Sequence, residues 1–485
     1  MREGFTLLNM KGAIAAGHPL TAEAGARVLR AGGSAVDACV AAAFVSWVCE
    51  SPLTGPGGGG FMLVHEAESG RTVVLDFFVA VPRAAAEGEL LELAVDFDGD
   101  TQQVFRTGAA AVAVPGTALG LSAAHERWGR VPWAELVAPA AALAREGFEL
   151  MPVQGYLHGI LDGLLRHSPE GDAMYGVEGR AVRAGERFAS PELGATLDRL
   201  AEEGVSVLYT GDLAERIVEH VRRGGGALAL QDLAAYEVIE REPVSVEYRG
   251  HEFRSNPPPS SGGVLIALGL LSLGDQDPTP AAIADAMEAQ EAARDAAFAR
   301  ALHDGDAALQ VLKGTTHISV LDADGNAGSL SASLGSGSGV VVPGTGIHLN
   351  NMLGELDLMG ASQPGERLTS MMSPSIVLSE GRPRLVIGSA GSARLRGAIL
   401  QVVANVVARD MDVEAAVEAP RIHAEAGVVH CEDPAAADAL EAEGRAVVRW
   451  KERNLYFGGV SAVEIRGDRA YAAGDLRRGG TGIVA

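Results

Sequence analysis

Residues 313–333, KGTTHISVLDADGNAGSLSAS, contain two strand-like runs joined by the turn-forming stretch DADGN. Apolar and small residues alternate in both runs, and the Asp and Gly between them favour a tight chain reversal. The segment is therefore predicted to be an antiparallel hairpin. Hairpins of this kind have to be packed against other elements of a fold, which limits the architectures that the chain can adopt.

The rest of the chain combines further hairpins with helices. Residues 242–255 and 375–388 have hairpin patterns, whereas residues 133–148, 281–304 and 393–410 have helical spacing. The combination predicts an α+β fold in which sheet is layered against helices.

Residues 21–50 are predicted to form two helices near the start of the chain. Thr21 is placed as the N-cap of the first helix, and Gly32 and Gly33 are placed at its end. Ser34 is expected to cap the second helix, which is apolar all round and therefore buried.

Composition and charge exclude several functions. The 485 residues are 47% hydrophobic and carry a formal net charge of -24, which disfavours nonspecific binding to nucleic acid or to anionic membranes. No segment approaches the ~18 apolar residues of a membrane span. Residues 1–17 lack the basic and apolar regions of a secretory leader, so a cytoplasmic location is expected.

The three cysteines, Cys39, Cys49 and Cys431, are expected to be free packing residues.

Several motifs resemble known functional sites but lack residues that those sites require. The glycine run at 55–60 lacks the Lys-Ser/Thr ending of a phosphate loop, so close backbone packing is the favoured interpretation. The DADGN stretch has Ser333 where a calcium loop needs a carboxylate. The twelve histidines show no spacing typical of a metal site. Neither a metal nor a cofactor is predicted.

Thr315 is the candidate nucleophile. A threonine hydroxyl needs an adjacent base, and a chain-terminal threonine has one in its own α-amine, whose pKa is ~8. That arrangement requires cleavage of the Gly314–Thr315 bond. A three-residue hairpin loop would place Ser333 opposite Thr315, whereas a two-residue loop would pair Ser333 with Thr316.

The sequence resembles the γ-glutamyltransferase (glutathione hydrolase) family of N-terminal-nucleophile hydrolases over essentially its whole length. The matching blocks, in chain order, are LTAEAGARVLRAGGSAVDACVAA, GPGGGGFMLV, VPGTALGLSAAHERWG, YRGHEFRSNPPPSSGG, TTHISVLDADGNA, GIHLNNM, MMSPSIV and GSAGSARL. The resemblance implies a four-layer αββα sandwich, cut by its own threonine into a large subunit, 1–314, and a small subunit, 315–485.

The resemblance also implies roles for individual residues. Thr315 would be the nucleophile, Ser333 would bond to it, and Gly391 and Ser392 would supply the backbone N–H groups of an oxyanion hole. Ser392 stands where the family has a glycine, and a serine suits a backbone donor there if its φ is negative. Glu355 would hold a substrate amine, and Thr369 and Ser370 are both candidates for the serine pair that binds substrate.

The departures from the family concern the substrate. Phe78 stands where the family has an arginine that binds the γ-glutamyl α-carboxylate, so a bidentate grip is lost. Gly335 and Met352 replace an Asn and a Gln. Arg394 or Arg396 could hold a substrate carboxylate from another side. The alternative role, an ion pair within the protein, is favoured more for Arg396 than for Arg394. Phe78 could instead mark an apolar acyl pocket.

The predicted function is that of a self-processing amidohydrolase or acyltransferase that cleaves γ-glutamyl amides such as glutathione. One alternative is a related amidase that acts on another acyl group, and a second is an inactive relative that serves as a scaffold. The expected partners are a small-molecule amide and the chain's own two fragments as a heterodimer. A homo-oligomer is compatible with the sequence.

Overall fold

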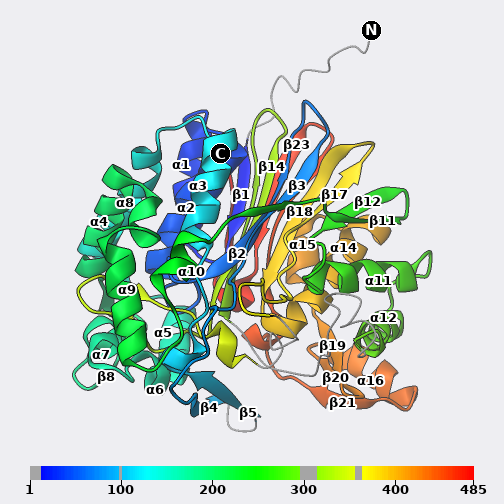
Figure 1. Cartoon of the computed structure of the whole chain (residues 1–485). Coiled ribbons are helices and arrows are strands. Elements are labelled where there is room, and N and C mark those ends of the chain that lie inside the picture. The colour runs from blue at the N-terminus through cyan, green and yellow to red at the C-terminus, as the bar shows by residue number, and fades with distance from the viewer. Residues whose placement is uncertain (1–11, 98–100, 295–313, 356–362) are drawn as a thin grey trace.

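The computed structural model describes residues 12–97, 101–294, 314–355 and 363–485. Two sheets lie face to face in the middle of the molecule, with helices on both outer sides (Figure 1). This is the αββα arrangement that the family resemblance implies.

The first sheet has seven strands, and the central ones are almost entirely buried. In spatial order they are β10 (Ile239–Arg241), β3 (Thr72–Phe77), β2 (Gly59–His65), β14 (Ala327–Gly335), β13 (Gly314–Leu321), β1 (Ala13–Ala16) and β24 (Thr481–Val484).

The second sheet has six strands, and all neighbours in it are antiparallel. In spatial order they are β11 (Val244–Tyr248), β12 (His251–Ser255), β17 (Ser375–Ser379), β18 (Arg382–Ala390), β22 (Gly459–Arg466) and β23 (Arg469–Gly474). The predicted hairpins at 242–255 and 375–388 are confirmed.

Helices from the first half of the chain cover the first sheet, on the left in Figure 1. They include α1 (Pro19–Arg30), α2 (Ala35–Cys49), α3 (Thr117–Trp128), α4 (Trp133–Glu146), α8 (Pro191–Glu203) and α9 (Asp212–Arg223). Shorter helices complete this side of the molecule: α5 (Pro152–Ile160), α6 (Asp162–Leu165), α7 (Pro169–Tyr175) and α10 (Leu230–Ala234).

Helices on the right in Figure 1 cover the second sheet. They are α11 (Gly262–Leu273), α12 (Pro280–Ala292), α14 (Leu395–Ala408), α15 (Val413–Glu418) and α16 (Pro434–Ala442). The predicted helix at 281–304 is present up to Ala292, and its second half lies outside the described residues. A small sheet of β19 (Ile422–Glu425), β20 (Val428–Cys431) and β21 (Ala446–Arg449) and a hairpin of β4 (Leu91–Phe97) and β5 (Thr101–Thr107) extend from the sandwich.

The second helix follows its sequence closely. All fifteen residues of α2 are buried, and Ser34 caps the helix through a capping box with Asp37. The prediction for the first helix is partly wrong, because Thr21 is not its cap. Helix α1 begins at Pro19, whose fixed φ suits a first helical position, and His18 accepts the N–H of Leu20. Thr21 is thereby left to make a tertiary contact.

No helix in the described part of the chain combines the length and apolar character that a membrane crossing needs. Cys39, Cys49 and Cys431 are free and buried, as predicted.

Candidate active site

Thr315 lies at the start of β13, near the middle of the first sheet. Gly314 pairs with Gly335 and Thr316 pairs with Ala332, and the register shifts between these pairs. At the other end of the hairpin the N–H of Asp322 donates to the carbonyl of Asn326, which leaves a three-residue loop. The predicted three-residue loop is confirmed, and the register that it sets runs as far as Thr316. Thr315 itself lies at the irregularity, where it faces both Ser333 and Leu334.

Ser333 is buried, and its Oγ accepts a hydrogen bond from the N–H of Gly335 at 2.8 Å. On its other side, Ser333 pairs with Gly59 in β2. A Cβ on Gly58 would lie 2.4 Å from the Ser333 carbonyl oxygen, and a Cβ on Gly60 would lie 2.3 Å from that of Ser331. The glycine run is therefore required for close backbone packing against β14, as predicted.

Thr316 faces the helix layer and is held by a buried carboxylate. Glu50, which follows α2, accepts the hydroxyl of Thr316 at 2.7 Å and that of Thr21 at 2.8 Å. Burial raises the pKa of Glu50, although both hydroxyl donors and the nearby Arg478 oppose that shift. Sequence reasoning did not identify Glu50. The one sequence feature that pointed to Glu50 was its position as an acidic residue directly after a largely apolar helix.

His317 faces the second sheet. Its Nδ1 lies 2.7 Å from Ser331 Oγ, and its Nε2 lies 3.0 Å from Ser319 Oγ. Burial lowers the pKa of His317 to about 3, so the imidazole is neutral near pH 7. The ring occupies space left by Gly388 in β18, where a Cβ would lie 2.2 Å from the imidazole.

A small cavity lies beside Thr315. With a volume of about 20 Å³, it has room for about one water-sized molecule. Glu50, Thr316, Ala390 and Arg478 line it together with Thr315. Sequence reasoning also missed Arg478, which approaches from near the C-terminus.

The candidate oxyanion loop follows directly from Ala390, the last residue of β18. Gly391 has φ 128° and Ser392 has φ 61°. The condition set for Ser392, a negative φ, is therefore not met, since Ser392 has a left-handed backbone as the first residue of the 3-10 helix Ser392–Arg394. Because Ala390 and Thr315 line the same cavity, the fold brings this loop to the candidate nucleophile.

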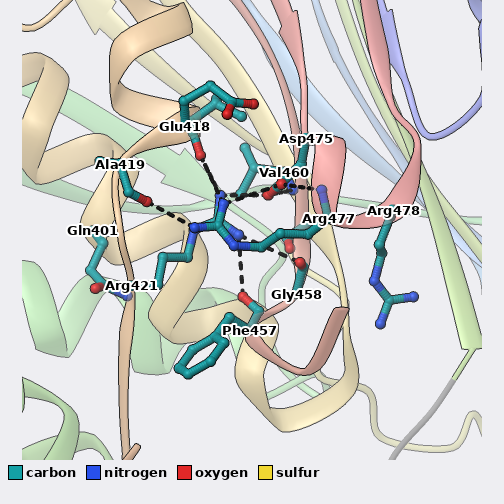
Figure 2. Close-up of polar contacts among 12 residues, drawn as sticks. Gln401, Glu418, Ala419, Arg421, Phe457, Gly458, Val460, Asp475, Arg477 and Arg478 are labelled. Atoms are coloured by element: carbon teal, nitrogen blue, oxygen red, sulfur yellow. Dashed lines mark hydrogen bonds and ion pairs between the residues drawn. The ribbon is translucent and has the colours of Figure 1, made fainter. Parts of the chain in front are cut away.

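A buried ion cluster centred on Asp475 lies beside Gly458, a neighbour of the candidate oxyanion loop (Figure 2). Asp475 pairs with Arg421 at 2.6 Å and with Arg477 at 3.2 Å. Burial alone would raise the pKa of Asp475, but the two guanidinium groups outweigh it and lower the pKa. Arg421 also donates to the carbonyl of Gly458, and a Cβ on Gly391 would lie 2.7 Å from the Cα of Gly458.

Phe78 is buried in the core between the two sheets. Its ring stacks on Phe61 with the centroids 5.3 Å apart. Met352 and Leu368 belong to the same apolar cluster. The Phe78 ring thus lies in an apolar cluster, while its backbone bonds to Asp76 and Tyr236, and Arg367 pairs with that Asp76.

Glu355 is also buried and lies close to the hairpin. A Cβ on Gly335 would be 2.4 Å from its Oε1, so the glycine at 335 makes room for this carboxylate. Gly335 is two residues along β14 from Ser333, so Glu355 lies near that end of the strand. Its role toward a substrate amine stays a prediction.

The two candidates for the serine pair differ in burial. Ser370 is buried, and its Oγ accepts the N–H of Met372 at 3.1 Å. The hydroxyl of Ser370 is thereby tied to the local backbone, whereas Thr369 is half-buried. Their roles in binding a substrate stay predictions.

The two arginines beyond the oxyanion loop have different surroundings. Arg396 is fully buried and pairs with Glu291, which confirms the ion-pair interpretation. Arg394 is also buried, and its guanidinium lies 4.4 Å from the centre of the Tyr456 ring. Arg394 therefore packs on an aromatic face, and its proposed role toward a substrate carboxylate stays a prediction.

Comparisons with known proteins show the family to which the chain is related. The sequence profile of the family described as Gamma-glutamyltranspeptidase matches residues 21–307 and 281–485. A glutathione hydrolase proenzyme of Pseudomonas aeruginosa is 31% identical over 98% of this chain and 94% of its own. The Acylase ACY 1 proenzyme of Pseudomonas sp. (strain SE83) is 34% identical over 94% of this chain and 90% of its own. The crystal structure of a cephalosporin acylase from Bacillus halodurans superposes with a TM-score of 0.83 at 26% identity, covering 98% of this chain and 96% of that one.

Proposed function

Because the chain belongs to the gamma-glutamyltranspeptidase family, we propose that it is a self-processing amidohydrolase with Thr315 as its nucleophile. The main support is the position of Thr315, which faces the Ser333–Leu334 irregularity of β14 and shares a cavity with Ala390, the residue before the candidate oxyanion loop. An inactive scaffold would need none of these features.

The first step is cleavage of the chain itself. Thr315 Oγ attacks the carbonyl carbon of Gly314, and the acyl group moves from the Thr315 nitrogen to its oxygen. Water then hydrolyses the ester, which frees the carboxylate of Gly314 and the α-amine of Thr315. The products are the fragments 1–314 and 315–485.

The second step uses the new terminus on a substrate amide. The α-amine takes the proton of Oγ as the oxygen attacks the substrate carbonyl, and the N–H groups of Gly391 and Ser392 stabilise the negative charge on the carbonyl oxygen. The leaving amine accepts the proton, and an acyl-enzyme remains. Water, or an acceptor amine, then removes the acyl group and regenerates Thr315.

We further propose that the preferred acyl group is not γ-glutamyl. A γ-glutamyl group carries a carboxylate and an ammonium, and binding the carboxylate calls for a cation. Phe78 and its neighbours offer an apolar environment at the position where the family has that cation. One full-length relative is named an acylase, which supports this choice, whereas γ-glutamyl amides remain the substrate class suggested by the glutathione hydrolase relatives.

Anilide substrates test both parts of the proposal. The enzyme is expected to release nitroaniline from simple acyl p-nitroanilides, which carry no carboxylate, faster than from γ-glutamyl p-nitroanilide. Faster turnover of the γ-glutamyl compound would refute the acyl preference while leaving the nucleophile in place. Activity that survives in Thr315→Ala would refute the assignment of Thr315 itself.

A further inference from the structure

Glu50 connects three segments around the candidate nucleophile. Its two oxygens accept the hydroxyls of Thr21 in α1 and Thr316 in β13, while its backbone caps the end of α2. The space around the carboxylate is tight, since a Cβ on Gly17 would lie 2.9 Å from Oε2. Glu50 therefore fixes the start of β13, one residue from Thr315, against the helix layer.

Arg478 differs from its neighbour Arg477. Arg477 is paired with Glu432 and Asp475, whereas Arg478 points away from that ion cluster (Figure 2). Its side chain crosses Gly459, where a Cβ would lie 2.4 Å from the Arg478 Cδ. Its Nη2 donates to the carbonyl of Leu455 at 3.3 Å and lies beside Gly391.

Glu50 and Arg478 line the same cavity as Thr315, yet in the part of the chain that the structure describes they form no ion pair with each other. Burial lowers the pKa of Arg478 to about 10, with Arg394 contributing, so the guanidinium stays charged at neutral pH. Within the same described part, Nε of Arg478 has no hydrogen-bond partner. Among the described residues, Arg478 therefore lines the cavity beside Thr315 without a direct ion pair to neutralise its charge.

We propose that Glu50 and Arg478 are positioning residues for Thr315. Glu50 holds the strand start through Thr316, and Arg478 keeps the new α-amine in its neutral, basic form. Before cleavage, the same cation favours the negative charge that develops on the Gly314 carbonyl oxygen. This inference rests on the proposed role of Thr315 as an N-terminal nucleophile.

Four other titratable groups near Thr315 do not supply this effect. His317 is neutral, and Cys49, beside Glu50, is also neutral because burial raises the pKa of its thiol. Asp475 is already paired with two arginines, and Arg394 packs on Tyr456. A cation disfavours a protonated amine and a carboxylate favours it, so removal of either charge should move the amine pKa in opposite directions.

The test is the pH profile of kcat/KM for the better of the two anilide substrates, measured on self-cleaved enzyme. The acidic limb of that profile reports the base in the free enzyme. In Arg478→Met the limb should move up by about one pH unit, whereas Arg478→Lys should stay near the wild type. In Glu50→Gln it should move down. Unchanged limbs in both Arg478→Met and Glu50→Gln would overturn the inference.

Self-cleavage of the same variants provides a second test of the inference. An Arg478→Met chain that folds but stays uncut supports the inference if Arg478→Lys is cut, because only the charge has been restored. If both variants fold and both stay uncut, the charge is not the property that matters, and the inference is wrong. A wild-type chain that stays uncut would instead refute the proposed function.

Discussion

At the residue scale, Ser333 is the proposed partner of Thr315 whose role is easiest to isolate. Its Oγ accepts the N–H of Gly335, which orients the hydroxyl at the irregularity of β14 that faces Thr315. We expect Ser333→Ala to slow both self-cleavage and amide hydrolysis by about 10- to 100-fold, the effect of losing one strong hydrogen bond. Ser333→Thr keeps the hydroxyl and should stay within a few-fold of the wild type. Equal rates for the alanine variant and the wild type would contradict this role.

Ser392 gives a second prediction, on stability. Its φ of 61° is costly for any residue with a Cβ. Ser392→Gly should therefore raise the free energy of unfolding by about 1 kcal/mol, as measured by urea denaturation. Activity should stay within about twofold, because the donor is a backbone N–H. A glycine variant that is less stable than the wild type would show that the serine side chain matters more than the backbone strain.

At the element scale, the packing of β13 against β18 depends on one glycine. A Cβ at position 388 would meet the imidazole of His317, so Gly388→Ala should lower the free energy of unfolding by roughly 1–3 kcal/mol. Gly159→Ala is a matched control, since Gly159 lies exposed in α5 with no atom near its Cβ position. Helix propensity should make that variant neutral or slightly more stable. An equal decrease in the free energy of unfolding in the two variants would contradict the packing argument.

The elements themselves could largely be predicted from the sequence, because strand alternation and turn residues act locally. The three-residue loop and the buried α2 are examples. The contacts of Glu50 and Arg478 with the nucleophile region could not be predicted, since they join segments that lie far apart in the chain. The error at Thr21 has the same origin, because its hydroxyl bonds to Glu50 instead of capping its own helix.

At the scale of the whole molecule, buried histidines should make the fold sensitive to mild acid. Burial lowers the pKa of His317 to about 3, and it lowers the pKa values of five other histidines to about 4: His18, His65, His158, His348 and His423. Between pH 6.5 and 5 the unfolded chain therefore binds more protons than the folded one, so stability falls as the pH falls.

The measurement is the thermal midpoint of the wild-type protein at pH 7.5 and at pH 5. We expect a decrease of several degrees at pH 5. Burial raises the pKa values of Glu50 and Asp322, so these two carboxyl groups make the folded state more stable as the pH falls. The six histidines outnumber them. An equal or higher midpoint at pH 5 would show that the imidazoles are not held neutral in the folded state.

The topology also bears on the two proposed fragments, because each sheet contains strands from both. Strands β2 and β1 flank the β14–β13 hairpin in the first sheet, and β12 pairs with β17 in the second. Separation of the fragments would therefore break both sheets. This arrangement supports the proposal that residues 1–314 and 315–485 remain together as a heterodimer after cleavage.

The central claim, that Thr315 is freed as a new N-terminus, is tested most directly by the masses of the purified chain under denaturing conditions. We predict two polypeptides, the smaller with the mass of residues 315–485 and an N-terminal threonine, which elute together under native conditions. Thr315→Ala should give one uncut chain. A wild-type chain that remains a single species after prolonged incubation, or that is cut at another bond, would contradict the account.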